Sequence, residues 1–172
     1  MSTFTKTGDD ESDFWHLDGS ATFSIFPANT VPMFNRDLPI RLHVGNLTYG
    51  QVHTEKHWNF KTAGNRTVPQ LIHFKLGQSG NVYATEKEKK VKITMGITPG
   101  GLMVMEYRYQ KIEERLDEYL SVITFYGPQR KVDGTIIGRY QGRPRPVLIP
   151  VVAVAAPADY ANESDADRLA RK

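Results

Sequence analysis

The chain has 172 residues, a net charge of +3 and no cysteine. This length suits one domain that buries its core without disulfide or metal support. The lack of cysteine excludes disulfide bonds, thiolate zinc sites and a cysteine nucleophile, and it is compatible with the reducing cytoplasm, where we expect the protein to act. The sequence has neither a signal-peptide pattern nor an apolar run of bilayer length, so we expect no membrane partner.

The first 45 residues predict short extended segments rather than helices. Acidic and small polar residues predict a disordered acidic arm over residues 1–13. Aromatic clusters predict short strands at residues 14–15 and 23–26, and alternation predicts another strand over residues 40–44.

Two short helices and a series of strands are expected further along the chain. The helices cover residues 49–58 and 67–76. Alternating apolar and polar residues predict five strands, at residues 81–85, 90–95, 102–109, 121–126 and 135–140. Ile112 and Leu116, at helical spacing among charged residues, predict a further amphipathic helix over residues 111–119.

The connections between these strands are too short for repeated parallel crossovers. The pattern therefore favours an α+β fold, with short N-terminal helices packed on a mostly antiparallel β-meander. We assign residues 14–157 to this single domain. Residues 158–172 form a C-terminal tail with a helical pattern.

Positive charge is concentrated in the middle of the chain. Residues 61–150 carry a net charge of +7, whereas residues 1–60 carry −3 and residues 151–172 carry −1. A localised basic segment is typical of proteins that bind a polyanion, most simply nucleic acid. A solvated basic surface with no partner would explain the same counts.

Nine cationic residues of this segment are candidates for binding nucleic acid. They are Lys87, Lys89, Lys90, Lys92, Arg130, Lys131, Arg139, Arg143 and Arg145. Lys90 and Lys92 share one face of a predicted strand, which suits a phosphate backbone. The arginines lie among glycine and tyrosine, a composition suited to stacking on bases. Simple solubility, or binding of an acidic protein, would account for the same residues.

His53, Lys56 and His57 form a compact cluster on the first predicted helix. His53 and His57 lie one turn apart on the same face. Such a pair can hold a metal with a third ligand, for which His43 and His73 are candidates. Alternatively, one imidazole acts as a general acid or base near neutral pH, with Lys56 available to a phosphate. Two ordinary surface histidines would show the same spacing. We expect no metal and no cofactor.

The order of these elements resembles that of a family of small ribonucleases. A helix with His53, Lys56 and His57 precedes a second helix, a meander and a late strand that reads Ser-Val-Ile-Thr-Phe-Tyr and contains Thr124. This order, over residues 40–127, resembles the barnase, EndoU, colicin and RelE-like metal-independent ribonucleases of phages and other mobile elements.

The resemblance implies a toxin-type endoribonuclease that cleaves RNA without a metal. The ribose 2′-hydroxyl would attack the adjacent phosphate, with His53 or His57 as the base or acid. Lys56, or a lysine of the predicted sheet such as Lys90, would stabilise charge on the phosphate, and Thr124 would orient the phosphate through its hydroxyl.

Two other classes of protein fit the sequence. One is a non-catalytic nucleic-acid-binding or regulatory protein of phage or plasmid type, and the other is a structural assembly subunit. The expected partner is nucleic acid, with RNA favoured. An acidic protein inhibitor or an assembly partner would also fit the basic surface.

Overall fold

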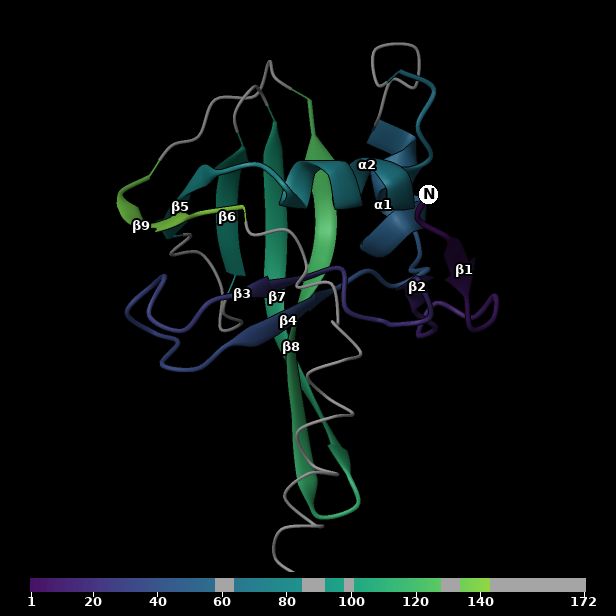
Figure 1. The fold of residues 1–172 in the computed structure, drawn as a ribbon, viewed down its shortest axis with the longest axis horizontal. Helices are drawn as coiled ribbons and strands as arrows, with labels where there is room; N and C mark the ends of the chain where they lie inside the picture. The colour runs from purple at the N-terminus through teal and green to yellow at the C-terminus, as the bar shows by residue number, and fades with distance from the viewer. Residues whose placement is uncertain (58–63, 85–91, 98–100, 128–133, 143–172) are drawn as a thin grey trace, which may run out of the picture.

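A computed structural model shows a mixed fold of helices and strands in which strands predominate (Figure 1). It describes residues 1–57, 64–84, 92–97, 101–127 and 134–142. The prediction of a mixed class is confirmed at this level. Neither helix in these ranges has the length and apolar character that crossing a bilayer requires.

Two helices and nine strands make up the described residues. The helices are α1 (Gly50–His57) and α2 (Val68–Leu76), close to the ranges predicted for them. The strands are β1 (Phe4–Lys6), β2 (Trp15–Leu17), β3 (Ser24–Phe26), β4 (Leu38–Arg41), β5 (Gly80–Ala84), β6 (Lys92–Ile97), β7 (Leu102–Ile112), β8 (Arg115–Tyr126) and β9 (Ile136–Tyr140).

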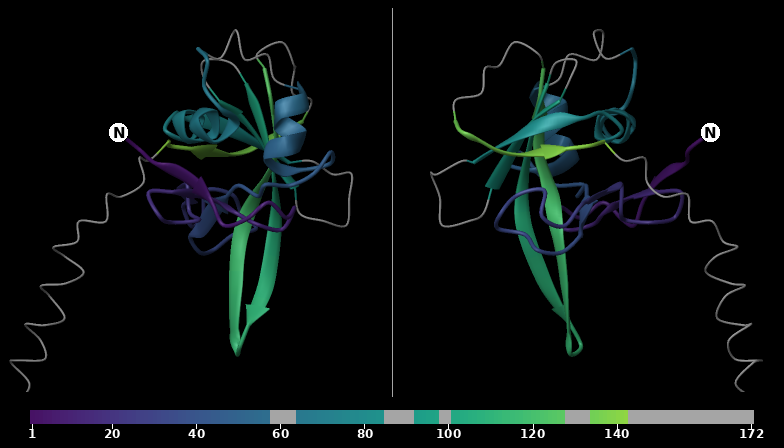
Figure 2. Two further views of the ribbon diagram at one scale, coloured as in Figure 1. Left: turned by 90° about the vertical axis from the view of Figure 1, so that its right-hand side faces the viewer. Right: turned by 60° about the vertical axis from the view of Figure 1, so that its left-hand side comes forward.

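Seven strands form one curled sheet in the order β3-β4-β8-β7-β6-β5-β9 (Figure 2). Neighbouring strands are antiparallel except β4 and β8, which are parallel. β5, β6, β7 and β8 are neighbours in chain order, because each short connection returns the chain beside the strand it has just left. β8 thus lies between this antiparallel run and the N-terminal strands.

Residues 1–13, whose composition predicts a disordered arm, contain β1. This strand pairs with β2 in a separate two-stranded sheet, with Phe4 opposite Leu17. The Thr3 backbone N–H donates to the Asp18 carboxylate at 2.7 Å. Composition alone does not reveal such pairing, because the acidic side chains accept backbone hydrogen bonds here instead of only contacting solvent.

The helix predicted over residues 111–119 is wrong. Residues 111–112 end β7, Glu113 and Glu114 form the turn, and residues 115–119 begin β8. Glu113 adopts the positive φ of 55° that a two-residue hairpin turn requires. Continuous antiparallel pairing with the preceding strand overrides the local helical spacing, as tertiary context commonly does.

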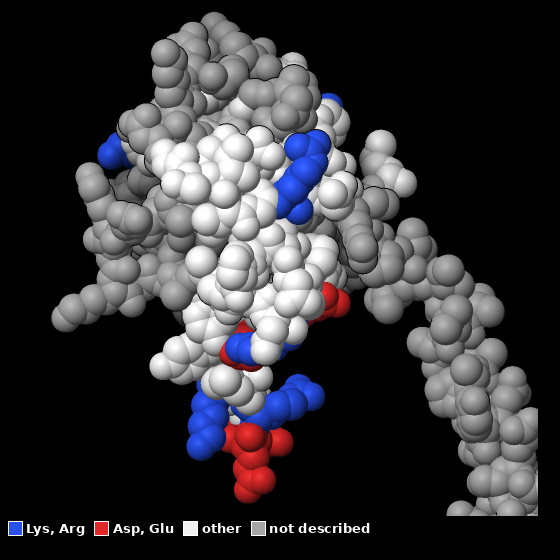
Figure 3. Space-filling model, turned by 90° about the vertical axis from the view of Figure 1, so that its left-hand side faces the viewer, with Lys and Arg blue, Asp and Glu red and all other residues white. Residues whose placement is uncertain are grey.

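The hairpin extends beyond the rest of the sheet as an arm. We define the arm as residues 107–119, beyond the last β7 residue that pairs with β6 and before the first β8 residue that pairs with β4. The arm projects from the body in both views of Figure 2. Acidic and basic side chains intermix at its tip (Figure 3).

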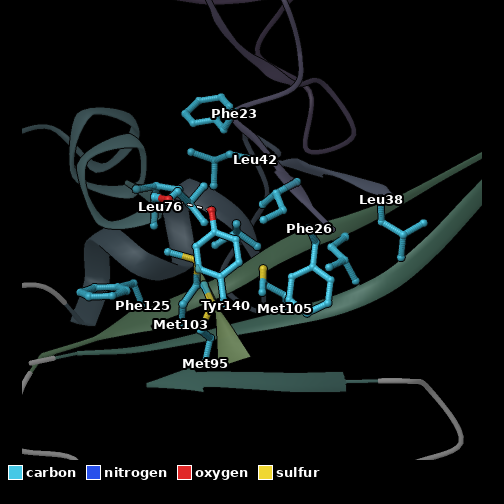
Figure 4. Close-up of a cluster of buried hydrophobic side chains, with 14 of the residues drawn as sticks. Phe23, Phe26, Leu38, Leu42, Leu76, Met95, Met103, Met105, Phe125 and Tyr140 are labelled. Carbon is cyan, nitrogen blue, oxygen red and sulfur yellow. Dashed lines mark hydrogen bonds between the residues drawn. The ribbon is translucent and has the colours of Figure 1, made fainter. Parts of the chain in front are cut away.

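Tyr140 of β9 joins distant parts of the core (Figure 4). Its hydroxyl donates to the Leu76 carbonyl at the end of α2 at 2.7 Å, and it lies 2.9 Å from the Ser24 hydroxyl of β3. Its ring stacks on Phe26, with centroids 6.1 Å apart. The two edge strands of the curled sheet are therefore tied together through one fully buried side chain.

We predict that Tyr140→Phe lowers the free energy of unfolding by about 1–3 kcal/mol, because the Leu76 carbonyl then loses its buried donor. Urea unfolding of the variant and the wild type measures this difference. Tyr109→Phe is the matched control, since Tyr109 is 66% exposed on the arm and its loss of a hydroxyl should change stability by less than about 0.5 kcal/mol. Equal effects of the two substitutions would contradict the role of Tyr140.

Candidate active site

The two faces of the sheet differ in chemistry. Met95, Met103 and Phe125 belong to the apolar core on one face of β6, β7 and β8. The opposite face of the same strands presents buried polar side chains, which we call the polar layer. Its members are Thr94, Glu106, Ser121 and Thr124.

A β-bulge aligns two hydroxyl groups of the polar layer. Val104 pairs with Thr124, but the next β7 residue, Met105, pairs with Val122 and skips Ile123. Opposed residues in a ladder share a face, so Ser121 and Thr124 lie on the same face although three positions separate them. Both hydroxyls are buried and have no hydrogen-bond partner in the described part of the chain.

Residues 43–57 contact this polar face along its length. Near the arm, the His43 Nε2 atom lies 3.1 Å from the Tyr119 hydroxyl. At the same level of the ladder, the guanidinium of Arg108, the residue opposite Tyr119, lies over the ring of Tyr49, 4.4 Å from its centroid. At the end of α1, the ring of His57 lies 5.8 Å from that of Tyr126. α1 consequently lies beside the C-terminal half of β8 (Figure 1).

A tight turn fixes where α1 begins. Gly45 has a φ of 73°, and a Cβ there would lie 2.0 Å from the Tyr49 carbonyl oxygen. The Gln51 backbone N–H donates to the His43 carbonyl at 3.0 Å, which gives a first-turn donor a partner outside the helix. The start of α1 is therefore held against the segment that follows β4.

The predicted histidine pair is present on α1. The rings of His53 and His57 lie 4.7 Å apart, centroid to centroid, at an interplanar angle of 77°. His53 Nδ1 lies 2.6 Å from the Leu47 carbonyl oxygen. A carbonyl only accepts hydrogen bonds, so Nδ1 carries the proton and Nε2 of the neutral ring is the proton acceptor.

Lys56 and Thr124, the other two predicted catalytic residues, occupy contrasting environments. Lys56 is exposed and adjoins His57 on α1. Thr124 lies on β8 two residues before Tyr126, the residue that contacts His57, and so shares its face. Its side chain is only 2% exposed. The structure thus brings the strand of Thr124 beside the histidine helix but keeps the threonine hydroxyl away from solvent.

Of the nine predicted nucleic-acid-binding residues, only Arg139 has a described side chain. It is exposed on β9 and donates to the Asn81 side chain of β5 at 3.4 Å. β9 is the far edge strand from β8 in sheet order, so Arg139 belongs to a different part of the sheet from the histidine pair. Lys92 begins β6, and its side chain is not described. The other seven lie outside the described residues: Lys87, Lys89, Lys90, Arg130, Lys131, Arg143 and Arg145.

The two histidines considered as a third metal ligand lie elsewhere. The ring of His43 stacks on Phe14, and that of His73 packs against Phe4. Within the ranges that the structure describes, no three histidine, aspartate or glutamate side chains come together as a metal site.

Sequence reasoning missed the buried polar residues of β7. Glu106 is 6% exposed, and its carboxylate lies 3.5 Å from the guanidinium of Arg108. The signal was available, because Val104, Glu106 and Arg108 alternate with Met103, Met105 and Tyr107. This alternation predicts the strand, but it does not indicate that residues 43–57 contact its polar face.

His43 is buried in a largely aromatic environment. It is 5% exposed, and its Nδ1 atom lies 3.1 Å from the Ser12 carbonyl oxygen. Burial, assisted by the nearby positive charge of Arg108, lowers the pKa of His43 from 6.5 to about 4. His43 is therefore neutral in the fold near neutral pH and orients Tyr119.

No protein-family model matches the chain, and neither a curated protein nor a solved structure matches it significantly.

We predict that Thr124→Val leaves the free energy of unfolding unchanged or raises it by about 1 kcal/mol, since valine keeps the shape and removes an unpartnered buried hydroxyl. Thr54→Val on α1 is the control, because the Thr54 hydroxyl donates to the Gly50 carbonyl at 2.9 Å and its loss should destabilise. Chemical denaturation of both variants measures the two effects. A loss of more than about 1 kcal/mol in Thr124→Val would show that the hydroxyl has a partner.

We predict that acid weakens the fold through His43. The unfolded chain binds a proton at this residue near pH 6.5, whereas the folded chain binds it near pH 4. As the pH falls from 6.5 to 4, the free energy of unfolding therefore decreases by roughly 1.4 kcal/mol per pH unit. His43→Gln should be less stable at neutral pH but lack this component. Denaturation curves from pH 7 to pH 4 give the difference in slope. Identical slopes would rule out His43 as the titrating group.

Proposed function

We propose that the protein is a metal-independent endoribonuclease in which His53 and His57 act as a general base and a general acid. The observation that carries this proposal is the hydrogen bond from His53 Nδ1 to the Leu47 carbonyl. A base held in one tautomer by a third group, beside a second proton-transfer residue, is the arrangement that activates a hydroxyl nucleophile.

In the proposed reaction, His53 Nε2 removes the proton of a ribose 2′-hydroxyl. The 2′ oxygen attacks the adjacent phosphorus, and the bond from phosphorus to the 5′ oxygen breaks. Protonated His57 gives its proton to the departing 5′ oxygen. The products are a 2′,3′-cyclic phosphate and a free 5′-hydroxyl, and water later returns the histidines to their starting protonation states.

Lys56 supplies the positive charge in this scheme. It is exposed and adjacent in sequence to His57, so its ammonium group can approach a phosphate that contacts the histidine pair. Stabilising charge on the phosphorane contributes directly to lowering the barrier. We give Thr124 no contact with the phosphate, because its hydroxyl is buried in this structure. In this proposal, Thr124 only forms part of the β8 face that lies beside α1.

The arrangement of elements also supports the proposal. The ribonuclease resemblance implies helices followed by an antiparallel meander, and α1 and α2 precede the run from β5 to β8. The extra helix expected over residues 111–119 would have separated the last two meander strands. In the structure, a two-residue turn joins β7 directly to β8. No helix therefore separates these two strands, and this difference from the order of elements in the ribonucleases is absent.

The partners and compartment follow from this proposal. The substrate is RNA, because the attacking group is the 2′-hydroxyl that DNA lacks. A toxic ribonuclease calls for an inhibitor, and an acidic protein would suit the basic segment of residues 61–150. The cysteine-free chain is compatible with the reducing cytoplasm, where cellular RNA is available.

The decisive experiment incubates the purified protein with total RNA in excess EDTA. We expect wild-type protein to cleave RNA and to leave cyclic phosphate ends. His53→Asn should lose at least about a hundredfold in rate, a typical contribution of a general base. Asparagine can still donate to the Leu47 carbonyl, so the loss would arise from the missing base rather than from a changed loop. His57→Ala should show a loss of similar size.

His16→Ala is the matched control, because His16 lies on β2, outside α1, and should retain full activity. Circular dichroism and urea unfolding confirm that each variant is folded. Full activity of His53→Asn or His57→Ala would remove that residue from the mechanism. An inactive wild type that binds RNA in a salt-sensitive way would instead support a non-catalytic binding protein.

A further inference from the structure

Tyr126 connects the sheet to the proposed catalytic pair. It is the last residue of β8, its backbone pairs with Leu102 of β7, and its side chain is half-buried. Its ring lies 5.8 Å from that of His57, centroid to centroid, at an interplanar angle of 54°. The ladder therefore fixes the backbone of an aromatic residue that contacts His57 from outside α1.

The two histidines are held in different ways. The ring of His53 is oriented by the hydrogen bond from its Nδ1 atom to the Leu47 carbonyl oxygen. His57 is exposed and is the last residue of α1. Helix ends fray, so a side chain at this position depends on contacts outside the helix to keep one orientation. The ring of Tyr126 provides such a contact.

The proposed reaction also requires His57 to carry a positive charge. Lys56, the neighbouring residue on α1, is a cation that disfavours a second positive charge beside it. The Glu55 carboxylate accepts from the Gln51 side chain at 2.7 Å, one turn back along the helix. The face of an aromatic ring is electron-rich and attracts a cation within about 6 Å of its centroid. The ring of Tyr126 lies within this distance of His57 and favours its charged form.

We propose that Tyr126 is a positioning residue of the ribonuclease site, whose ring holds protonated His57 where it can give its proton to the departing 5′ oxygen. This inference rests on the proposed function, because it takes His57 as the general acid. The contact is made by the aromatic ring, so the role does not require the phenol hydroxyl. Tyr126 therefore affects the rate of proton transfer rather than the binding of RNA.

Replacement of the ring tests this role. We expect Tyr126→Leu to lower kcat for RNA cleavage at least about tenfold with little change in KM, since a misplacement of about 1 Å can cost on the order of a hundredfold. Tyr126→Phe keeps the ring and should retain the wild-type kcat. Tyr83→Leu is the matched control, because Tyr83 is also a half-buried strand tyrosine but lies on β5, which β6 and β7 separate from β8.

A ribonucleotide p-nitrophenyl phosphodiester separates the positioning role from a merely structural one. Attack by its 2′ oxygen breaks the bond from phosphorus to the nitrophenyl oxygen, and nitrophenolate departs without taking a proton. This substrate still needs the base but not the acid. We expect Tyr126→Leu and His57→Ala to cleave it at close to the wild-type rate, and His53→Asn to remain slow.

The outcomes separate this inference from the proposed function. Equal losses of Tyr126→Leu on RNA and on the ester would overturn the inference, because they would indicate a damaged site rather than a misplaced acid. An active wild type with unchanged kcat in Tyr126→Leu, or with a large loss in Tyr126→Phe, would also overturn this inference alone. A wild type that cleaves neither substrate would overturn the proposed function and this inference with it.

Discussion

The antiparallel ladder between β7 and β8 is the interaction on which the rest of the structure depends. It pairs eleven residues of β7 with β8, from Leu102 opposite Tyr126 to Ile112 opposite Arg115. The N-terminal part of β8 forms one strand of the arm, its middle pairs with the parallel strand β4, and its C-terminal part lies beside α1. A shift of this register by one residue would exchange the apolar and polar faces, so one ladder sets the core, the polar layer and the arm together.

The buried hydroxyl groups of the polar layer, on one face of the sheet, lower the stability of the fold. Phe125 and Met103 bury apolar surface on the core side, while Ser121 and Thr124 bury hydroxyls without described partners on the other. Each such hydroxyl costs about 1–3 kcal/mol relative to a bonded one. Departures from local consistency of this kind concentrate at functional sites. Their position on the strand beside the histidine helix agrees with the proposed location of the active site.

Much of the local structure follows from the sequence, because the strands after residue 80 alternate clearly and both helices have recognisable ends. The histidine pair was also predictable, since four-residue spacing on a helix brings two side chains to one face. The errors have a common cause. Residues 111–119 have helical spacing, and residues 1–13 have the composition of a disordered arm, but long-range strand pairing decides both. The bulge at Ile123 and the contact between residues 43–57 and the polar face depend on tertiary geometry, which residue periodicity does not encode.

The most direct test of the account is the protonation state of the His53 ring, measured by nitrogen-15 NMR of the selectively labelled protein at neutral pH. The proposed mechanism requires the proton on Nδ1, donated to the Leu47 carbonyl, and an unprotonated Nε2 that can act as the base. We expect the long-range proton–nitrogen couplings to identify this tautomer, and the Leu47 hydrogen bond to keep it the dominant form. A ring that is mainly protonated on Nε2, or that exchanges freely between tautomers, would contradict the claim that the turn before α1 prepares His53 for catalysis.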